Sequence, residues 1–250
     1  MKRTAGTLPL TKRTAKRRKV VHSMPRGTAA RPLVVTSIPR SLVSRTQSPL
    51  PKQFKANLKY SEYVSLDPGL GAVAEHSFRC AGLHDPNLTG AGHQPRGYDQ
   101  LAAMYDKYTV IGSKITVRVS ANGSGTNGSM LGIMVLPHAT FAGGSTLIDY
   151  AEAQNNVNHI YKQTGGTGGA TMLVGENALS IGYSPKSLYG VSNPLDDATL
   201  GAEVGANPSK NPTFKIYNGQ LDGGDPPQTD VWVDIVYAVV FTCPINPTQS

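Results

Sequence analysis

Acidic residues are missing from the first 59 positions of this 250-residue chain, although the same stretch holds 15 Lys and Arg. The remaining positions carry the other nine basic residues and all 16 Asp and Glu, so the formal net charge of +8 conceals a body with a net charge of −7. A long segment of one charge sign is typical of tails that bind nucleic acid. We therefore expect a cationic arm attached to a mildly acidic body.

Cysteine is also scarce, with only Cys80 and Cys243 in the chain. Cys80 falls within a predicted strand and Cys243 just after the end of the last one, and two cysteines do not make a disulfide framework. We therefore expect two small buried hydrophobic side chains in a reducing compartment. No apolar run approaches the roughly 20 residues that span a bilayer, and the basic N-terminus lacks the apolar region of a secretory signal. We expect no membrane partner.

Motifs for catalysis or cofactor binding are equally few. The segment Gly123 to Gly128 matches the dinucleotide fingerprint, but a β-type run follows it, so no helix N-terminus is available for a pyrophosphate. The six histidines show no metal-ligand spacing. Asp222, Asp225 and Asp230 could gather around calcium, although Gly and Pro between acids are ordinary in loops. We expect no enzyme, no cofactor and no metal site.

Residues 1–52 mix Lys, Arg, Thr, Ser and Pro without a sustained apolar period. Such a segment cannot bury enough surface to offset its ordering entropy, and we interpret it as an arm that is disordered when free. The alternative is a tail that only keeps the protein soluble, but solubility does not require all charges to be positive. The arm residues that we expect to bind nucleic acid are Lys2, Arg3, Lys12, Arg13, Lys16, Arg17, Arg18, Lys19, Arg26, Arg31, Arg40 and Arg45.

The densest basic cluster of the arm lies near its start. It fits a nuclear-localisation signal and equally fits a phosphate-binding tail. Its residues are Lys12, Arg13, Lys16, Arg17, Arg18 and Lys19.

Residues 53–250 are predicted to form one all-β domain. Apolar and polar residues alternate with a period of two in several segments, which is typical of half-buried strands. Short helices are expected in the long connections, near residues 98–105 and 145–155. The eight predicted strands cover residues 53–66, 72–83, 108–119, 130–136, 157–163, 171–183, 213–217 and 229–241.

The connections between these strands alternate in character. The first, third, fifth and seventh are compact and glycine-rich, whereas the second, fourth and sixth are long. A jelly roll places all odd connections at one end of its sandwich and all even ones at the other. We therefore expect an eight-stranded jelly-roll sandwich in which four turns meet at one end, namely Asp67–Gly71, Ala121–Ser129, Thr164–Ala170 and Asn218–Gln228.

Four basic residues of the body fall on outward positions of two predicted strands. They are Lys55 and Lys59 on the first strand, and Lys114 and Arg118 on the strand that follows the short helix. In a jelly roll these two strands belong to the same sheet. Two interpretations remain open: solvated charges that resist edge pairing, or a sheet face that contacts nucleic acid beside the arm.

The stretch Gln94–Val119 changes its pattern twice. Pro95 and Gly97 indicate a turn, and Tyr98, Leu101 and Tyr105 then share one helical face. From Tyr108 the period becomes two. One side of this strand is predicted to hold Ile111, Ser113, Ile115, Val117 and Val119, and the other Lys114, Thr116 and Arg118.

The amino-acid sequence of this stretch resembles that of the capsid proteins of circular, replication-protein-encoding single-stranded DNA viruses, the circoviruses and their relatives. The resemblance is weaker at Ser184–Gly190 and in the last strand. The residues on which it mainly rests are Pro95, Arg96, Gly97, Tyr98, Asp99, Met104, Tyr105, Tyr108 and Ser113–Val119. The resemblance covers the body in strand order. Circovirus arms are usually dense arginine runs, whereas Lys and Thr dilute this one, which indicates a more divergent relative.

The resemblance implies a jelly-roll capsid protein of the virion and host nucleus. Such a protein assembles with itself into a small icosahedral T=1 shell of roughly sixty copies. It would package a single-stranded DNA genome and use the host nuclear import machinery. Two alternatives remain: the capsid protein of a small RNA virus, which shares the fold and arm, and a nuclear nucleic-acid-binding protein that never assembles.

Overall fold

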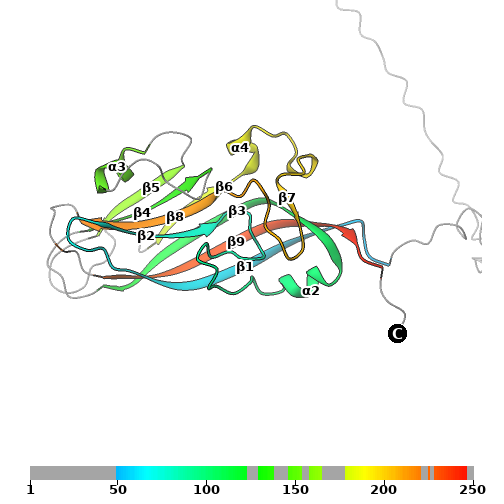
Figure 1. The fold of residues 1–250 in the computed structure, drawn as a ribbon, viewed down its shortest axis with the longest axis horizontal. Helices are drawn as coiled ribbons and strands as arrows, with labels where there is room; N and C mark the ends of the chain where they lie inside the picture. The colour runs from blue at the N-terminus through cyan, green and yellow to red at the C-terminus, as the bar shows by residue number, and fades with distance from the viewer. Residues whose placement is uncertain are drawn as a thin grey trace, which may run out of the picture. The chain divides into compact units, whose positions relative to one another are not determined.

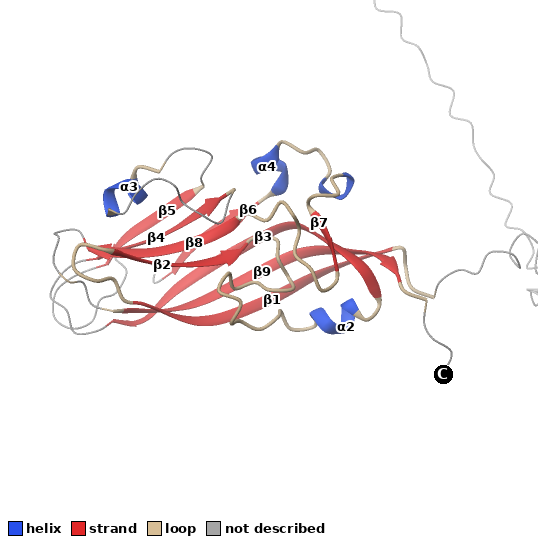
Figure 2. Cartoon of the chain, in the orientation of Figure 1, coloured by secondary structure: helices blue, strands red, loops and turns tan. Residues whose placement is uncertain are grey.

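The structure is a computed structural model that describes residues 49–122, 129–137, 146–153, 158–164, 178–220, 225 and 228–246. Its strands are β1 (Gln53–Leu66), β2 (Val73–Arg79), β3 (Tyr105–Asn122), β4 (Ser129–Leu136), β5 (His159–Thr164), β6 (Ala178–Tyr183), β7 (Gly201–Glu203), β8 (Thr213–Gln220) and β9 (Thr229–Pro244). Its helices, shown in Figure 2, are short: α2 (Tyr98–Ala102), α3 (Leu147–Ala151), α4 (Pro185–Tyr189) and the 3-10 helix η1 (Pro194–Asp196). None of the helices described is long and apolar enough to cross a membrane.

The strands form two antiparallel sheets that lie in two layers (Figure 1). One has the order β1-β9-β3-β6, with β7 also pairing with β3, and the other has the order β2-β8-β4-β5. Strands β1 and β2 are consecutive in the chain but lie in different sheets, and so do β3 and β4. This order is that of a jelly roll, so the predicted fold class is confirmed.

The strand ends that the four glycine-rich connections join lie at one end of the sandwich, at the left of Figure 1. In the first sheet Thr229 pairs with both Leu66 and Asn122. In the second sheet Ser129 pairs with both Thr164 and Gln220. The strand ends therefore lie where we predicted. Most residues of the last three connections lie outside the described part of the chain.

Several strand limits differ from the prediction. Strand β2 ends at Arg79 although Cys80–Leu83 are also buried. The residue opposite this continuation is Pro212, which accepts a hydrogen bond from Cys80 but has no N–H to return one, so the ladder stops. Strand β7 was not predicted, because three residues are too few to show a period. Residues 171–177, which we assigned to a strand, lie outside the described residues.

The predicted inward position of Ile111 is wrong. The pairing of β3 with β9 shifts between Val110 and Gly112, so Ile111 is an extra residue in the ladder and is 36% exposed. Val110 before this bulge and Ser113 after it are buried. A bulge of this kind changes which alternate residues face the core, and a strict period of two cannot show it.

The two cysteines have different environments, so the expectation that both are buried is wrong for one of them. Both are free thiols, and Cys80 is fully buried, which raises its pKa. Cys243 is exposed because it lies beyond Phe241, at the end of β9, where its φ of 58° is left-handed and interrupts the alternation of the strand.

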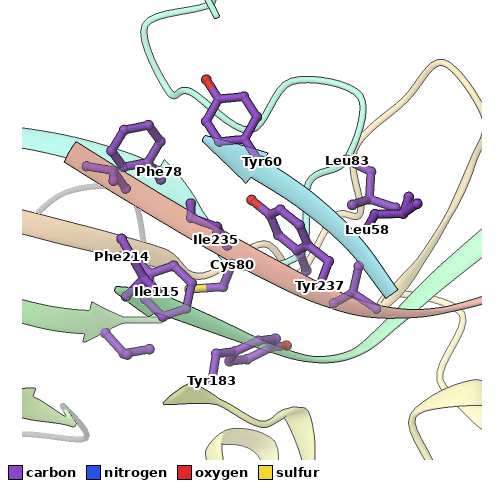
Figure 3. Packing of buried hydrophobic residues seen from close by; sticks show 14 of the residues in the cluster. Leu58, Tyr60, Phe78, Cys80, Leu83, Ile115, Tyr183, Phe214, Ile235 and Tyr237 are labelled. Carbon is purple, nitrogen blue, oxygen red and sulfur yellow. The ribbon is translucent and has the colours of Figure 1, made fainter. Parts of the chain in front are cut away.

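Inward-facing side chains from both sheets fill the space between the layers (Figure 3). Hydrogen bonds also link the two layers through this core. The fully buried Tyr237 of β9 donates to the carbonyl of Arg79 at 2.9 Å, and Ser113 of β3 donates to the carbonyl of Cys80 at 2.6 Å. Because an unpaired buried hydroxyl is costly, these bonds favour one alignment of the sheets.

Gly132 of β4 allows a tight packing arrangement on the outer side of the second sheet. A Cβ at Gly132 would overlap the ring of its cross-strand partner Tyr217. That ring is fully buried, lies 5.0 Å from the ring of Tyr150 in α3, and its hydroxyl is 2.5 Å from Nε2 of His159. Tyr217 therefore has little freedom to move away.

We expect Gly132→Ala to lower the free energy of unfolding by about 1–3 kcal/mol, because overpacking a rigid site displaces neighbouring side chains. Urea unfolding of the purified chain measures this effect. The matched control is Gly182→Ala in β6, where an added Cβ would lie 3.7 Å from the carbonyl oxygen of Ser113, an ordinary contact. Equal unfolding midpoints for the two variants would contradict the packing argument.

Candidate nucleic-acid interface

The first sheet carries basic side chains on its outer surface, which we call the basic face: the outward residues of β1, β9 and β3. Lys55 and Lys59 of β1 are exposed there, as are Lys114 and Arg118 of β3. Both strands belong to the same sheet, as predicted, with β9 between them. The structure therefore brings together the four basic residues of the body that the sequence singled out.

The register of β9 places these residues in rows across the sheet. Val236 pairs with Lys59 on one side and with Lys114 on the other, so one row holds two lysines around an exposed valine. Four residues away, Trp232 pairs in the same way with Tyr63 and Arg118. Side chains in one row of a sheet point to the same side, so both rows face away from the core.

Asp234 lies in the row between these two and joins their cations. Lys59 Nζ is 2.9 Å from its Oδ1, which also accepts a hydrogen bond from Ser61 at 2.5 Å. Arg118 forms an ion pair with its Oδ2. Burial acts to raise the pKa of Asp234, but these donors outweigh burial and hold the pKa well below its usual range. Asp234 is therefore ionised at neutral pH, and its charge is shared between two cations.

Two aromatic residues on the basic face were missed by the sequence analysis. Trp232 is 44% exposed and Tyr63 is 52% exposed. The Tyr63 hydroxyl donates to Asp230, which lowers the pKa of Asp230 and raises the pKa of Tyr63. Gln228 also donates to Asp230, at 3.0 Å. The alternation of inward and outward side chains could have identified these two residues, because both rings fall on the outward side of the predicted strands.

A further lysine and a hollow extend the basic face toward the start of β1. Lys107, which the sequence analysis did not select, is exposed and pairs with Thr242. A shallow hollow of about 180 Å³ lies beside Lys55 and Ile111, above the small side chain of Ala238. The face therefore offers positive charge along its length and space for a ligand group at one place.

The arm residues from Lys2 to Arg45 lie outside the described part of the chain, and so does Asp222 of the considered calcium site. Among the residues that the structure describes, no group of three or more His, Cys, Asp or Glu could hold a metal ion.

No protein-family model and no curated protein matches the sequence. Among solved structures, Turnip Yellow Mosaic Virus is 11% identical, with 80% of this chain and 99% of that chain covered and a TM-score of 0.42. Mud crab tombus-like virus is 14% identical, with coverages of 84% and 98% and a TM-score of 0.43. The decameric BFDV capsid protein is 10% identical, with coverages of 76% and 99% and a TM-score of 0.41. The strand order, and not these similarities, establishes the fold.

We expect Asp234→Asn to lower the free energy of unfolding at pH 7 by about 1 kcal/mol, since both cation partners are more than half exposed. A carboxylate whose pKa is depressed by folding stabilises the protein above its unfolded pKa, and the stabilisation is lost as the pH falls below that value. The difference between variant and wild type should therefore shrink below the ordinary pKa of 3.8.

Urea unfolding at pH 7 and near pH 3 measures this dependence. Asp67→Asn, an exposed acid in the connection after β1, is the control and should have little effect at either pH. A stability difference for Asp234→Asn that is unchanged at the lower pH would contradict the assignment.

Proposed function

We propose that this chain is a viral capsid protein whose body builds the shell and whose basic arm packages nucleic acid. The observation that carries the proposal is the distribution of charge on a jelly roll. Residues 1–52, with 13 basic and no acidic residues, lead into β1, and β1 itself presents Lys55 and Lys59 on the basic face of the sheet. Phosphates bound by such residues release counterions, which drives binding without sequence preference.

In this proposal residues 1–52 are the nucleic-acid-binding arm and residues 53–250 are the shell domain. The basic face contacts the packaged chain beside the arm, through Lys55, Lys59, Lys114 and Arg118. Copies of the shell domain contact one another to form a small icosahedral particle of T=1 symmetry. The proposed role of the chain is therefore structural and not catalytic.

We further propose a single-stranded DNA genome and a stage in the host nucleus. Both proposals rest on the circovirus-like sequence of Gln94–Val119. The capsid protein of a small RNA virus is the second candidate, because the arm and the fold suit either nucleic acid. A reporter fused to residues 1–25 tests the nuclear stage, since replacing Arg17 and Arg18 by alanine should abolish its import.

The purified chain should form large uniform particles in negative-stain electron microscopy. Nucleic acid extracted from them should be degraded by a single-strand-specific DNase and resist RNase. Degradation by RNase alone would favour the RNA virus. A chain that remains a monomer or dimer at all concentrations would contradict the capsid role and favour the nuclear binding protein.

Removing residues 1–45 should leave the body folded but abolish most nucleic-acid retention. The salt dependence of binding should fall too, because each phosphate neutralised in a single strand contributes about −0.7 to the slope of log affinity against log salt concentration. Binding measured at several salt concentrations gives this slope, and circular dichroism checks the fold. Unchanged affinity and slope in the shortened chain would exclude the arm as the main phosphate-binding element.

A further inference from the structure

We propose that Tyr63, Trp232 and Arg118 form a platform on which unpaired nucleotide bases stack, so that the basic face prefers single strands to duplex. This inference rests on the proposed function, because it names what that face recognises. It assigns a binding role to two aromatic residues that the charge pattern alone did not select.

The three residues form one row of the sheet. Trp232 of β9 pairs directly with Tyr63 of β1 and with Arg118 of β3. Adjacent strands lie about 4.8 Å apart, so the three residues leave the same face of the sheet within roughly 10 Å of one another. Aromatic rings and the planar guanidinium are the side-chain groups on which unpaired bases stack.

The two rings are open to a ligand. Tyr63 is 52% exposed and Trp232 is 44% exposed, although a large apolar ring is normally covered. Within the described part of the chain neither ring is paired with another aromatic ring, whereas Tyr60, Tyr105 and Tyr108 all are. The hydrogen bond from Tyr63 to Asp230 restrains one ring of the platform in place.

The lysines lie on one side of the platform, in the row of Val236 and beyond, whereas Asp230 lies on the other side. Lys59 and Arg118 meet at Asp234, in the row next to Trp232, and their charges exceed that of this carboxylate by one. The outward residues of β1, β9 and β3 include five basic residues and two acids. The basic residues are Lys55, Lys59, Lys107, Lys114 and Arg118, and the acids are Asp230 and Asp234.

This combination of groups favours nucleic acid over a second copy of the chain. The body as a whole has a net negative charge, but a protein partner does not require cations flanking exposed rings. A single strand presents a phosphate beside every base and base faces free to stack. In a duplex those faces are covered by neighbouring base pairs, so a duplex gains only the phosphate contacts.

The single tryptophan of the chain reports on this site directly. The full-length chain, freed of nucleic acid and kept below the concentration at which light scattering detects particles, is titrated with oligo-dT of about 20 nucleotides. Oligo-rU and a duplex of the same length serve as the comparison ligands. We expect both single strands to quench the fluorescence of Trp232 and the duplex to leave it nearly unchanged.

Variants separate stacking from charge. Trp232→Ala should weaken oligo-dT binding by about tenfold, and Trp232→Phe by less, because phenylalanine keeps a stacking surface. Tyr63→Ala retains the reporter and should weaken binding while quenching persists at saturation. The control is Tyr161→Ala, which removes a tyrosine of similar exposure, 50%, from the other sheet.

The outcomes distinguish this inference from the proposed function. Salt-dependent oligo-dT binding without quenching, and with unchanged affinity for Trp232→Ala, would overturn the platform and leave the proposed function standing. Equal quenching by the duplex would overturn it as well. Trp232 fluorescence that responds to self-association but not to oligonucleotide would show that a second copy covers the rings. A full-length chain that binds no oligonucleotide would overturn both proposals.

Discussion

Strand β9 pairs with β1 on one side and with β3 on the other over almost its whole length. Because side chains alternate along a strand, its residues Val231, Val233, Ile235, Tyr237, Val239 and Phe241 are buried in the core, whereas Trp232, Asp234 and Val236 face outward. A slip of one residue would exchange the two sets and move a carboxylate into an apolar core. The register that stabilises the core is therefore also the register that builds the basic face.

The cost of misplacing polar groups acts on both surfaces of this sheet. On the inner side, the hydroxyls of Tyr237 and Ser113 reach backbone carbonyls at the end of β2, which links the two layers. On the outer side, Asp234 is mostly covered and remains ionised because Lys59 and Arg118 lie against it. Each of these groups has its partner only when the sheets and strands are aligned as observed.

The sequence contained enough information for the strand order but not for the arrangement of the site. Alternation located most strands, and the alternating lengths of the connections separated a jelly roll from other sandwiches. The bulge at Ile111 and the end of β2 at Pro212 depend on the facing strand, so no local pattern could show them. The same is true of the basic face. Alternation places Lys59, Trp232 and Arg118 outward, but only the register places Trp232 and Arg118 in one row and Lys59 two rows away, with Asp234 between them.

The arm and the basic face would contribute to binding in physically different ways. In the proposed function, binding by the arm would depend on counterion release and would weaken steeply as salt rises. The proposed stacking on Tyr63 and Trp232 would depend on contact between π surfaces, which salt screens little. The ion pairs at Asp234 neutralise part of the charge beside them. Low salt would therefore favour any polyanion through the arm, whereas higher salt would leave a preference for unpaired bases at the sheet. Selectivity for single strands should thus increase with ionic strength while total affinity decreases.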